Sequence, residues 1–262
     1  MRAAPRSTTV TNEWRPTPDP PERFSSGIPD FDRMIGGGFR RGSFALLSLD
    51  ESVRREDVDL VTFPTFLNTL YHSRGIVAIL PSNDSPHEFR ARLTRFATRR
   101  RFDSRVRVMD YVGEDEGPPY VVNFRAAGAT PSEKETTPRA RKAAIAQAVA
   151  AEKAAQGQRG RPFLEVVALE IFETLMGAEA ATKTYFLGVK RSRQLGNLAL
   201  GILGPGLGCA AAMRRMADVE FALHRDEVGL SIRGVHPAFP RHLVTPDRVA
   251  GPPHVALVPP PA

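Results

Sequence analysis

A glycine-rich turn lies directly before an apolar run in this chain, and that order constrains the fold more than any other feature. Between Ser25 and Ser48 the sequence reads SSGIPDFDRMIGGGFRRGSFALLS. A short helix carrying Phe31 is predicted ahead of Gly36 to Gly38, because glycine permits backbone angles that other residues avoid. The apolar run from Ser43 to Ser48 is typical of a strand buried on both faces. We therefore expect a largely parallel sheet to begin here.

Further short apolar runs alternate with helical stretches along the chain, which predicts an α/β fold. Pro64 is expected to start, kink or interrupt the helix predicted over 60–73. Ser85 and Pro86 are predicted to open the next helix, as its cap and in its first turn, and that helix should run to about Thr98. The remaining strands are expected at 75–80, 105–112, 163–169 and 198–203, with an antiparallel hairpin over 219–225 and 228–235. Helices are expected at 179–196 and 210–216.

Three segments have compositions that differ from this core. Residues 1–22 hold five prolines and few apolar residues, and 246–262 end in VPPPA, so both are predicted to be flexible. Residues 113–161 are rich in Gly, Pro, Ala, Lys and Glu, which predicts an insertion with an Ala-rich helix near 138–156. The core domain should therefore span 23–245.

The segment from Ser25 to Ser48 resembles the entry to the ATPase core of the RecA superfamily, in particular its KaiC-like branch. The downstream segment RMADVEFALHRDEVGLSIRGVHP also resembles that branch, so the resemblance covers nearly all of 23–245 except the insertion. It implies a RecA-like three-layer sandwich with a mostly parallel central sheet and a C-terminal β-hairpin. It also implies self-association, or association with a RecA/KaiC-like paralogue, because active relatives form rings or filaments.

In that family the first strand leads into the Walker A loop, GxxxxGK[ST], whose amides and lysine hold phosphates. Here LDESVRRED follows Ser48, so the loop glycines are absent. Arg55 falls at the lysine position and Glu56 at the hydroxyl position. The replaced Walker A positions are Leu49, Asp50, Glu51, Ser52, Val53, Arg54, Arg55 and Glu56. Without glycine the amides cannot converge on an anion, and the acids would repel a triphosphate, so we predict no bound cofactor.

Two catalytic positions of the family are also replaced. Asn83 and Asp84 stand where paired glutamates position the attacking water, and asparagine cannot act as a general base, whereas Asp84 could. Glu170 stands at the Walker B aspartate, where it could still bind magnesium through water. Ser82 to Ser85 could equally form a polar turn that caps the following helix. Three altered elements together indicate a pseudo-ATPase with no catalytic residues.

The formal net charge of +7 makes an anionic partner plausible. The charge is concentrated in FRARLTRFATRRRFDSRVRV, which could be a solvated helix face or a phosphate-contacting patch. The candidate nucleic-acid contacts are Arg90, Arg92, Arg95, Arg99, Arg100 and Arg101.

No stretch approaches the roughly 20 apolar residues of a membrane span, and the single Cys209 fits a reducing compartment, so a cytoplasmic location without membrane contact is expected. No histidine spacing indicates a metal site. The sequence leaves three functions open. They are a non-catalytic regulatory, assembly or interaction platform, a DNA-binding recombinase-like accessory protein in repair, and a divergent ATPase that uses Arg55, Asp84 and Glu170.

Overall fold

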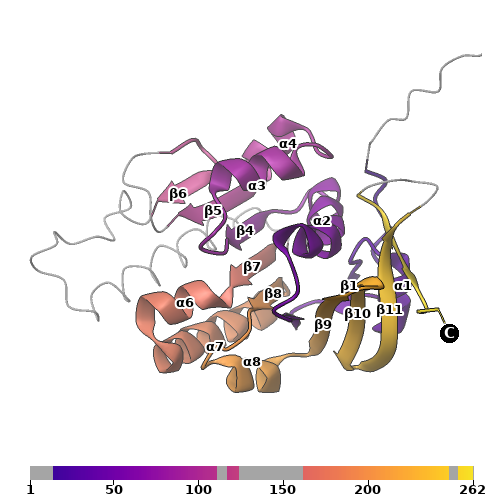
Figure 1. Cartoon of the computed structure of the whole chain (residues 1–262). Coiled ribbons are helices and arrows are strands. Elements are labelled where there is room, and N and C mark those ends of the chain that lie inside the picture. The colour runs from indigo at the N-terminus through magenta and orange to yellow at the C-terminus, as the bar shows by residue number, and fades with distance from the viewer. Residues whose placement is uncertain (1–13, 111–116, 124–161, 248–252, 262) are drawn as a thin grey trace, which may run out of the picture.

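The computed structural model describes residues 14–110, 117–123, 162–247 and 253–261. A ten-stranded sheet in the order β12-β11-β10-β9-β3-β8-β7-β4-β5-β6 forms the centre of this part of the chain (Figure 1). Neighbouring strands from β9 to β6 pair in parallel, and β10, β11 and β12 extend the sheet with antiparallel pairs. The predicted α/β fold with a mostly parallel sheet and a C-terminal hairpin is confirmed.

The strands are β1 (Arg23–Phe24), β2 (Phe39–Arg40), β3 (Phe44–Leu49), β4 (Ile76–Ile79), β5 (Val106–Asp110), β6 (Val121–Asn123), β7 (Leu164–Ala168), β8 (Leu198–Leu203), β9 (Val219–Asp226), β10 (Gly229–His236), β11 (Ala238–Pro246) and β12 (Val255–Val258). The helices are α1 (Pro29–Met34), α2 (Arg55–Tyr71), α3 (Pro86–Leu93), α4 (Arg99–Arg105), α6 (Leu169–Met176), α7 (Ala178–Leu195) and α8 (Ala210–Met216). Strands β1 and β2 form a separate two-stranded sheet.

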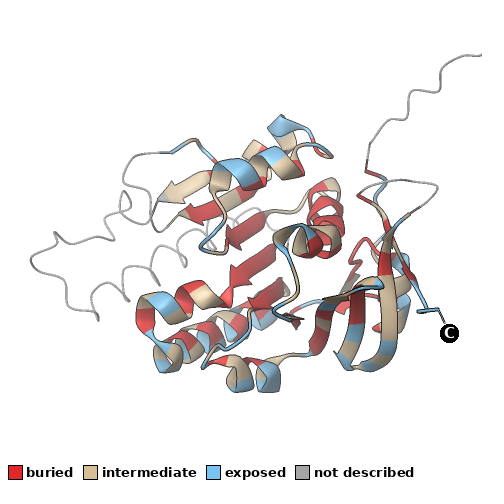
Figure 2. Ribbon diagram, viewed as in Figure 1, coloured by how far each residue is buried: buried red, intermediate tan, exposed pale blue. Residues whose placement is uncertain are grey.

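Two apolar layers sandwich the sheet, because successive side chains of a strand point to opposite faces. In β3, Ala45 and Leu47 pack with residues of α2, α3 and α4, whereas Phe44 and Leu46 pack with residues of α6, α7 and α8. The central strands are accordingly buried on both faces (Figure 2). This is the three-layer sandwich that the resemblance to the RecA superfamily implied.

The helical segments differ from the prediction at α2, at α3 with α4, and at α6, which was not expected. Helix α2 begins at Arg55 and passes through Pro64 without ending. The helix predicted to reach Thr98 ends at Leu93, and Thr98 instead caps α4 by accepting a hydrogen bond from the Arg101 amide. The predicted cap at Ser85 is confirmed, since its hydroxyl accepts from the Glu88 amide at 3.1 Å.

The C-terminal tail departs from the flexible segment that its prolines predicted. Strand β11 pairs with β10, and β12 pairs with β11, so the sheet continues to Val258. Val255 and Leu257 are buried, and the Leu257 amide donates to Asp30 Oδ2 at 3.0 Å. Two apolar side chains at alternate positions outweigh the prolines that flank them, because together they close one edge of the core.

The described part of the N-terminal arm is also packed against the core. Trp14 is 2% exposed, and its ring stacks on His254 with 4.3 Å between centroids. The Thr17 amide donates to Asn68 Oδ1 at 2.9 Å, and Asp19 pairs with Arg74. Prolines exclude helix here but leave an extended strap whose polar groups find partners. Residues 1–13 of the predicted arm lie outside the described residues.

The predicted insertion at 113–161 falls mostly outside the described residues, as does the Ala-rich helix expected near 138–156. Within it, Val121–Asn123 forms β6 beside β5, a strand that was not expected from the sequence. Tyr120 leads into this strand and is buried against Phe102.

Candidate functional site

Residues 49–56, which the resemblance aligns with the Walker A loop, lie with Asn83, Asp84 and Glu170 at the carboxyl ends of β3, β4 and β7. Ligands of open α/β sheets bind at this edge. The pocket that these residues line has a volume of ≈ 230 Å³. Sites for small molecules usually measure roughly 300–1,000 Å³, so this pocket is smaller than that range.

The loop after β3 uses its own polar groups internally. Asp50 Oδ1 accepts from the Ser52 amide at 3.0 Å and from its hydroxyl at 2.8 Å, which lowers the pKa of Asp50. The Ser52 hydroxyl in turn accepts from the Arg225 amide at 3.0 Å. No residue between Leu49 and Glu56 has a positive φ. The amides therefore do not form the concave nest that holds a phosphate.

The start of α2 is tied to β9 by an ion pair. Asp57 is buried, and it accepts from Arg225 Nε at 2.8 Å and from the Arg54 amide at 2.9 Å. Burial opposes ionisation, yet the hydrogen bonds from Arg225 and Arg54 outweigh it and lower the pKa of Asp57. The negative charge also suits a helix N-terminus.

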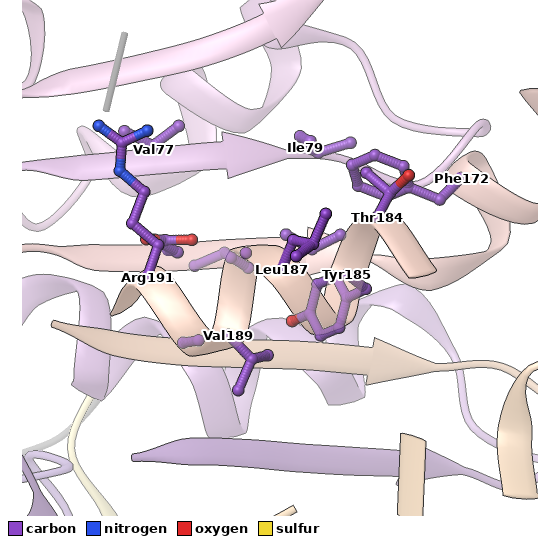
Figure 3. Close-up of a pocket in the computed structure, with 13 residues that line it drawn as sticks. Val77, Ile79, Phe172, Thr184, Tyr185, Leu187, Val189 and Arg191 are labelled. Atoms are coloured by element: carbon purple, nitrogen blue, oxygen red, sulfur yellow. The ribbon is translucent and has the colours of Figure 1, made fainter. Parts of the chain in front are cut away.

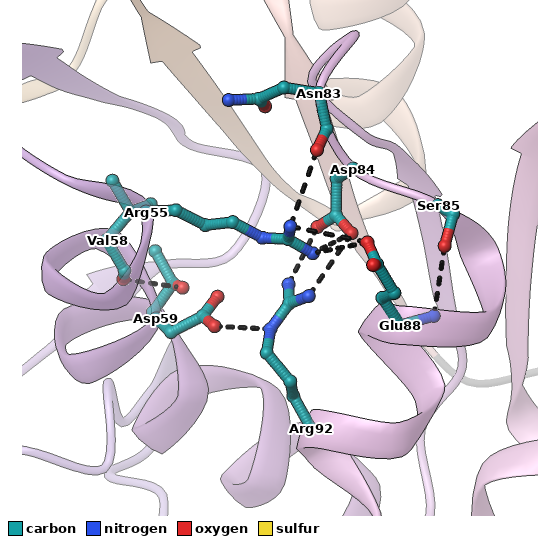
Figure 4. Close-up of polar contacts among 9 residues, drawn as sticks. Arg55, Val58, Asp59, Asn83, Asp84, Ser85, Glu88 and Arg92 are labelled. Atoms are coloured by element: carbon teal, nitrogen blue, oxygen red, sulfur yellow. Dashed lines mark hydrogen bonds and ion pairs between the residues drawn. The ribbon is translucent and has the colours of Figure 1, made fainter.

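Arg55, which the resemblance aligns with the Walker A lysine, belongs to a cluster with Asp59, Asp84, Glu88 and Arg92, which we call the arginine–carboxylate cluster (Figure 4). Arg55 pairs with Asp84, and its Nη1 lies 3.4 Å from Glu88 Oε2. Arg92 donates from Nη2 to Asp84 Oδ2 at 2.7 Å and from Nε to Asp59 Oδ2 at 2.6 Å. The cluster thereby joins α2, α3 and the loop between β4 and α3.

The carboxylates of this cluster are partly dehydrated. Burial, followed by the charge of Asp84, raises the pKa of Asp59 to about 7. Burial also raises the pKa of Asp84, although Arg55 opposes that change. The Asp84 side chain is 5% exposed, so both of its oxygens are committed to guanidinium groups inside the protein. Asp84 thus fills, for Arg55, the place that an anionic ligand would take.

Glu170 and Asn83 also have partners within the protein. Glu170 lies in the first turn of α6, and its Oε1 accepts from the Ser82 amide at 2.9 Å and the Ser82 hydroxyl at 3.1 Å. The carbonyl of Asn83 faces Arg55 Nη1 at 3.4 Å, while the residue is exposed. The polar turn over 82–85 that the sequence allowed is therefore present, and Glu170 connects it to the start of α6.

The six candidate nucleic-acid arginines divide into two groups. Arg90 forms a bidentate pair with Asp103 at 2.7 and 2.8 Å, and Arg92 belongs to the arginine–carboxylate cluster. Arg101 stacks on Tyr71, 3.8 Å from the ring centroid. The second group consists of Arg95, Arg99 and Arg100, which are exposed and form no ion pair within the described residues. Of the six, only these three, which we call the exposed arginine patch, could bind a phosphate without breaking a contact among the described residues.

A family model described as GvpD basic region 2 matches residues 13–227, which is most of the chain. The chain belongs to this family. Among curated relatives, it is 30% identical over 109 residues to Protein GvpD1 of Halobacterium salinarum and 31% identical over 101 residues to Protein GvpD2 of the same organism. These matches cover 41% and 38% of the chain but only 20% of each relative's length.

Among solved structures, a KaiC-like protein from Pyrococcus horikoshii matches this GvpD-family chain with a TM-score of 0.59 at 15% identity. The match covers 92% of the chain and all of the archaeal protein's chain. At this identity the likeness concerns the fold, and it confirms the RecA/KaiC-like architecture that the segment from Ser25 to Ser48 predicted.

A second cavity, of ≈ 210 Å³, lies on the opposite face of the sheet in this GvpD-family chain, between α7 and strands β4, β7 and β8 (Figure 3). Its walls are mainly apolar, with Val77, Ile79, Phe172 and Val189 among them, so it does not resemble a phosphate site. Tyr185 lines it, and burial raises the pKa of this phenol well above its ordinary value.

Cys209 is buried, and burial raises the pKa of its thiol to about 12, so it is a poor nucleophile at neutral pH. Within the described ranges, no three His, Cys, Asp or Glu side chains are placed to hold a metal ion. None of the described helices is long and apolar enough to cross a membrane.

Sequence reasoning missed Asp59 and Glu88 as parts of the site and assigned Arg92 to a different one. One signal was available, because Asp59 stands four residues after Arg55 and Arg92 four residues after Glu88, spacings that place charges on one helix face. The spacing could not show that α2 and α3 contact each other through these side chains.

Proposed function

We propose that this chain is a non-catalytic RecA/KaiC-like protein that serves as a regulatory, assembly or interaction platform. The observation that carries the proposal is the pairing of Arg55 with Asp84 in the arginine–carboxylate cluster. In an active relative the side chain at the Arg55 position would hold a phosphate. Here an internal carboxylate takes that place, so a nucleotide would have to displace a nearly buried ion pair before it could bind.

The divergent ATPase is less well supported. It requires Arg55 to donate hydrogen bonds to a phosphate, Asp84 to act as the base and Glu170 to bind magnesium. Each of these side chains already has protein partners. Both oxygens of the Asp84 carboxylate are also engaged by guanidinium groups, so the carboxylate would have to give up one of these contacts before it could orient a water molecule. The pocket of ≈ 230 Å³ adds a steric objection.

A platform needs a partner, and we propose self-association or docking onto a RecA/KaiC-like paralogue. The support is the retained sandwich and the net charge of +7, which favours association with an acidic surface. The family description names a basic region, and the exposed arginine patch lies in the most arginine-dense stretch of the chain.

Calorimetric titration of the full chain with ATP and Mg²⁺ tests the negative part of this proposal. We expect no saturable heat at micromolar ATP and no phosphate release, because the loop's polar groups and Arg55 are already engaged. The matched control is Arg55→Gln, which should behave like the unaltered chain. Micromolar binding that Arg55→Gln abolishes, together with turnover, would show that the chain is a divergent ATPase.

The second candidate function is DNA binding, which is favoured by the exposure of Arg95, Arg99 and Arg100. If these side chains contact three phosphates, the slope of log affinity against log salt should become shallower by about 0.9 for each phosphate that is no longer neutralised. We expect Arg95→Gln, Arg99→Gln and Arg100→Gln together to reduce that slope by roughly 2.7 in a duplex-binding assay.

A charge-matched control replaces three exposed cations of α7 and α8 with glutamine, namely Lys190, Arg191 and Arg215. This control should leave the salt dependence of duplex binding unchanged. If the unaltered chain does not bind duplex DNA even at low salt, the DNA-binding function is wrong. Equal slopes for both triple variants would rule out the exposed arginine patch as the contact.

A further inference from the structure

A polar pocket of ≈ 690 Å³ lies at the amino-terminal ends of β3 and β9, at the sheet edge opposite the replaced Walker A segment. The β1–β2 sheet, the turn before β3, the end of α7 and the turn after β10 surround it. Its charged lining consists of Arg23, Arg40, Arg41, Arg193 and Asp218. We call it the arginine pocket.

The pocket carries more positive charge than its own residues neutralise. Asp218 is the one carboxylate among its described lining residues, and Arg193 Nη2 donates to both carboxylate oxygens at 2.9 and 3.0 Å. Arg40 and Arg41 are exposed and form no ion pair within the described part of the chain. Arg23 donates to the Gly38 carbonyl at 2.8 Å, which leaves its charge uncompensated. Three guanidinium groups therefore lack a counterion among the residues that the structure describes.

Two of these cations directly oppose each other. Arg23 and Arg40 are register partners in the antiparallel pair of β1 and β2. Like charges at such positions destabilise a two-stranded sheet, because the side chains lie close together. An anion bound between them would remove that repulsion, whereas solvent only screens it.

A buried hydroxyl in the pocket lining also lacks a partner. Ser43 is 6% exposed, and its Oγ has no hydrogen-bond partner in the described ranges. Buried polar side chains are nearly always hydrogen-bonded, so an unpaired hydroxyl in a pocket wall indicates a group that can bond to a ligand. Because Ser43 belongs to the pocket lining, an acceptor inside the pocket would satisfy its O–H.

The backbone of one pocket wall is closely packed. Gly42 has a φ of +76°, and a side chain there would meet the Arg193 carbonyl oxygen at 2.9 Å. The turn before β3 therefore lies directly against the end of α7. A cavity that is formed before the ligand arrives avoids the entropy cost of ordering loops on binding.

We propose that the arginine pocket binds a small phosphorylated ligand that carries at least two negative charges. Phosphate oxygens match the planar donor groups of Arg40 and Arg41, and Ser43 Oγ donates one more hydrogen bond. The volume lies within the range of small-molecule sites, and a concave pocket suits a compact ligand better than a duplex backbone. The site is independent of the platform function and of the replaced Walker A segment.

The test uses pyrophosphate as the probe on the full, unaltered chain. Phenylglyoxal modifies exposed arginines, and peptide mass spectrometry reports each position separately. We expect pyrophosphate to protect Arg40 and Arg41 but not Arg99 and Arg100. Absence of protection at low salt would overturn the proposal, as would protection by duplex DNA but not by pyrophosphate, because that pattern would assign these arginines to a nucleic-acid contact.

Calorimetry on variants provides a second readout. Arg40→Gln with Arg41→Gln should weaken pyrophosphate binding at least ~10-fold, since the charge-assisted hydrogen bonds from both guanidinium groups are removed. Arg99→Gln with Arg100→Gln changes the charge equally and should leave affinity unchanged, as should Arg55→Gln. An equal loss in either control would overturn the assignment. Circular dichroism identifies a variant that fails to fold, and the protection experiment then decides alone.

Discussion

Replacing Asp84 with asparagine is expected to lower the free energy of unfolding by about 3 kcal/mol, measured by urea denaturation at neutral pH. The Asp84 side chain is 5% exposed and accepts from both Arg55 and Arg92. Asparagine keeps the shape but removes the charge, so two partly buried guanidinium groups lose the carboxylate that they share, and Arg92 keeps only Asp59. Because both arginines keep some contact with water, the loss should lie at the low end of the roughly 3–5 kcal/mol typical of broken buried pairs.

Glu88→Gln is the matched control for this prediction, because it removes the other carboxylate near Arg55. The Glu88 side chain is 63% exposed and lies 3.4 Å from Arg55, so water screens the interaction and the loss should stay within ~0.5 kcal/mol. The double variant Arg55→Gln with Asp84→Asn should show coupling of about 1–3 kcal/mol. If Asp84→Asn and Glu88→Gln both lowered the free energy of unfolding by only ~0.5 kcal/mol, the arginine–carboxylate cluster would not stabilise the fold.

The parallel core could be predicted from the sequence because burial on both faces leaves a continuous apolar signal. β8 (Leu198–Leu203) and α8 (Ala210–Met216) match the expected ranges, and the hairpin of β9 and β10 differs by one residue at its ends. The Ser85 cap was predictable because capping is a local interaction. Strand β12 was not, because four residues between prolines give a weak local signal and only its packing against the core selects the strand.

The candidate site was predictable in position but not in chemistry. Aligning the chain on Ser48 placed Arg55, Asp84 and Glu170 at one sheet edge, and they line one pocket. The sequence could not show that Arg55 is paired with Asp84, because that contact depends on how closely α2 and the β4–α3 loop approach. It also could not separate Arg92, whose charge is paired internally, from Arg95, whose charge faces water, although the two stand only three positions apart.

The N-terminal strap leads to the second large effect, since Trp14→Ala should lower the free energy of unfolding by about 3–5 kcal/mol. Trp14 is 2% exposed and stacks on His254, so its removal opens a cavity between the strap and the segment that leads into β12. A flexible arm would lose almost nothing. Urea denaturation distinguishes these outcomes, and a loss below ~0.5 kcal/mol would mean that the strap is not part of the folded core.

Leu187→Ala serves as the control for the loss of apolar area, because Leu187 lies on α7 and is 64% exposed. It should change the free energy of unfolding by no more than ~0.5 kcal/mol. His254→Ala should reproduce part of the Trp14→Ala loss, and the two losses should not add, because both remove the same stacked contact. Additive losses would mean that the ends of the chain are held separately. Non-additive losses mean that two proline-rich segments, far apart in sequence, stabilise the core as one unit.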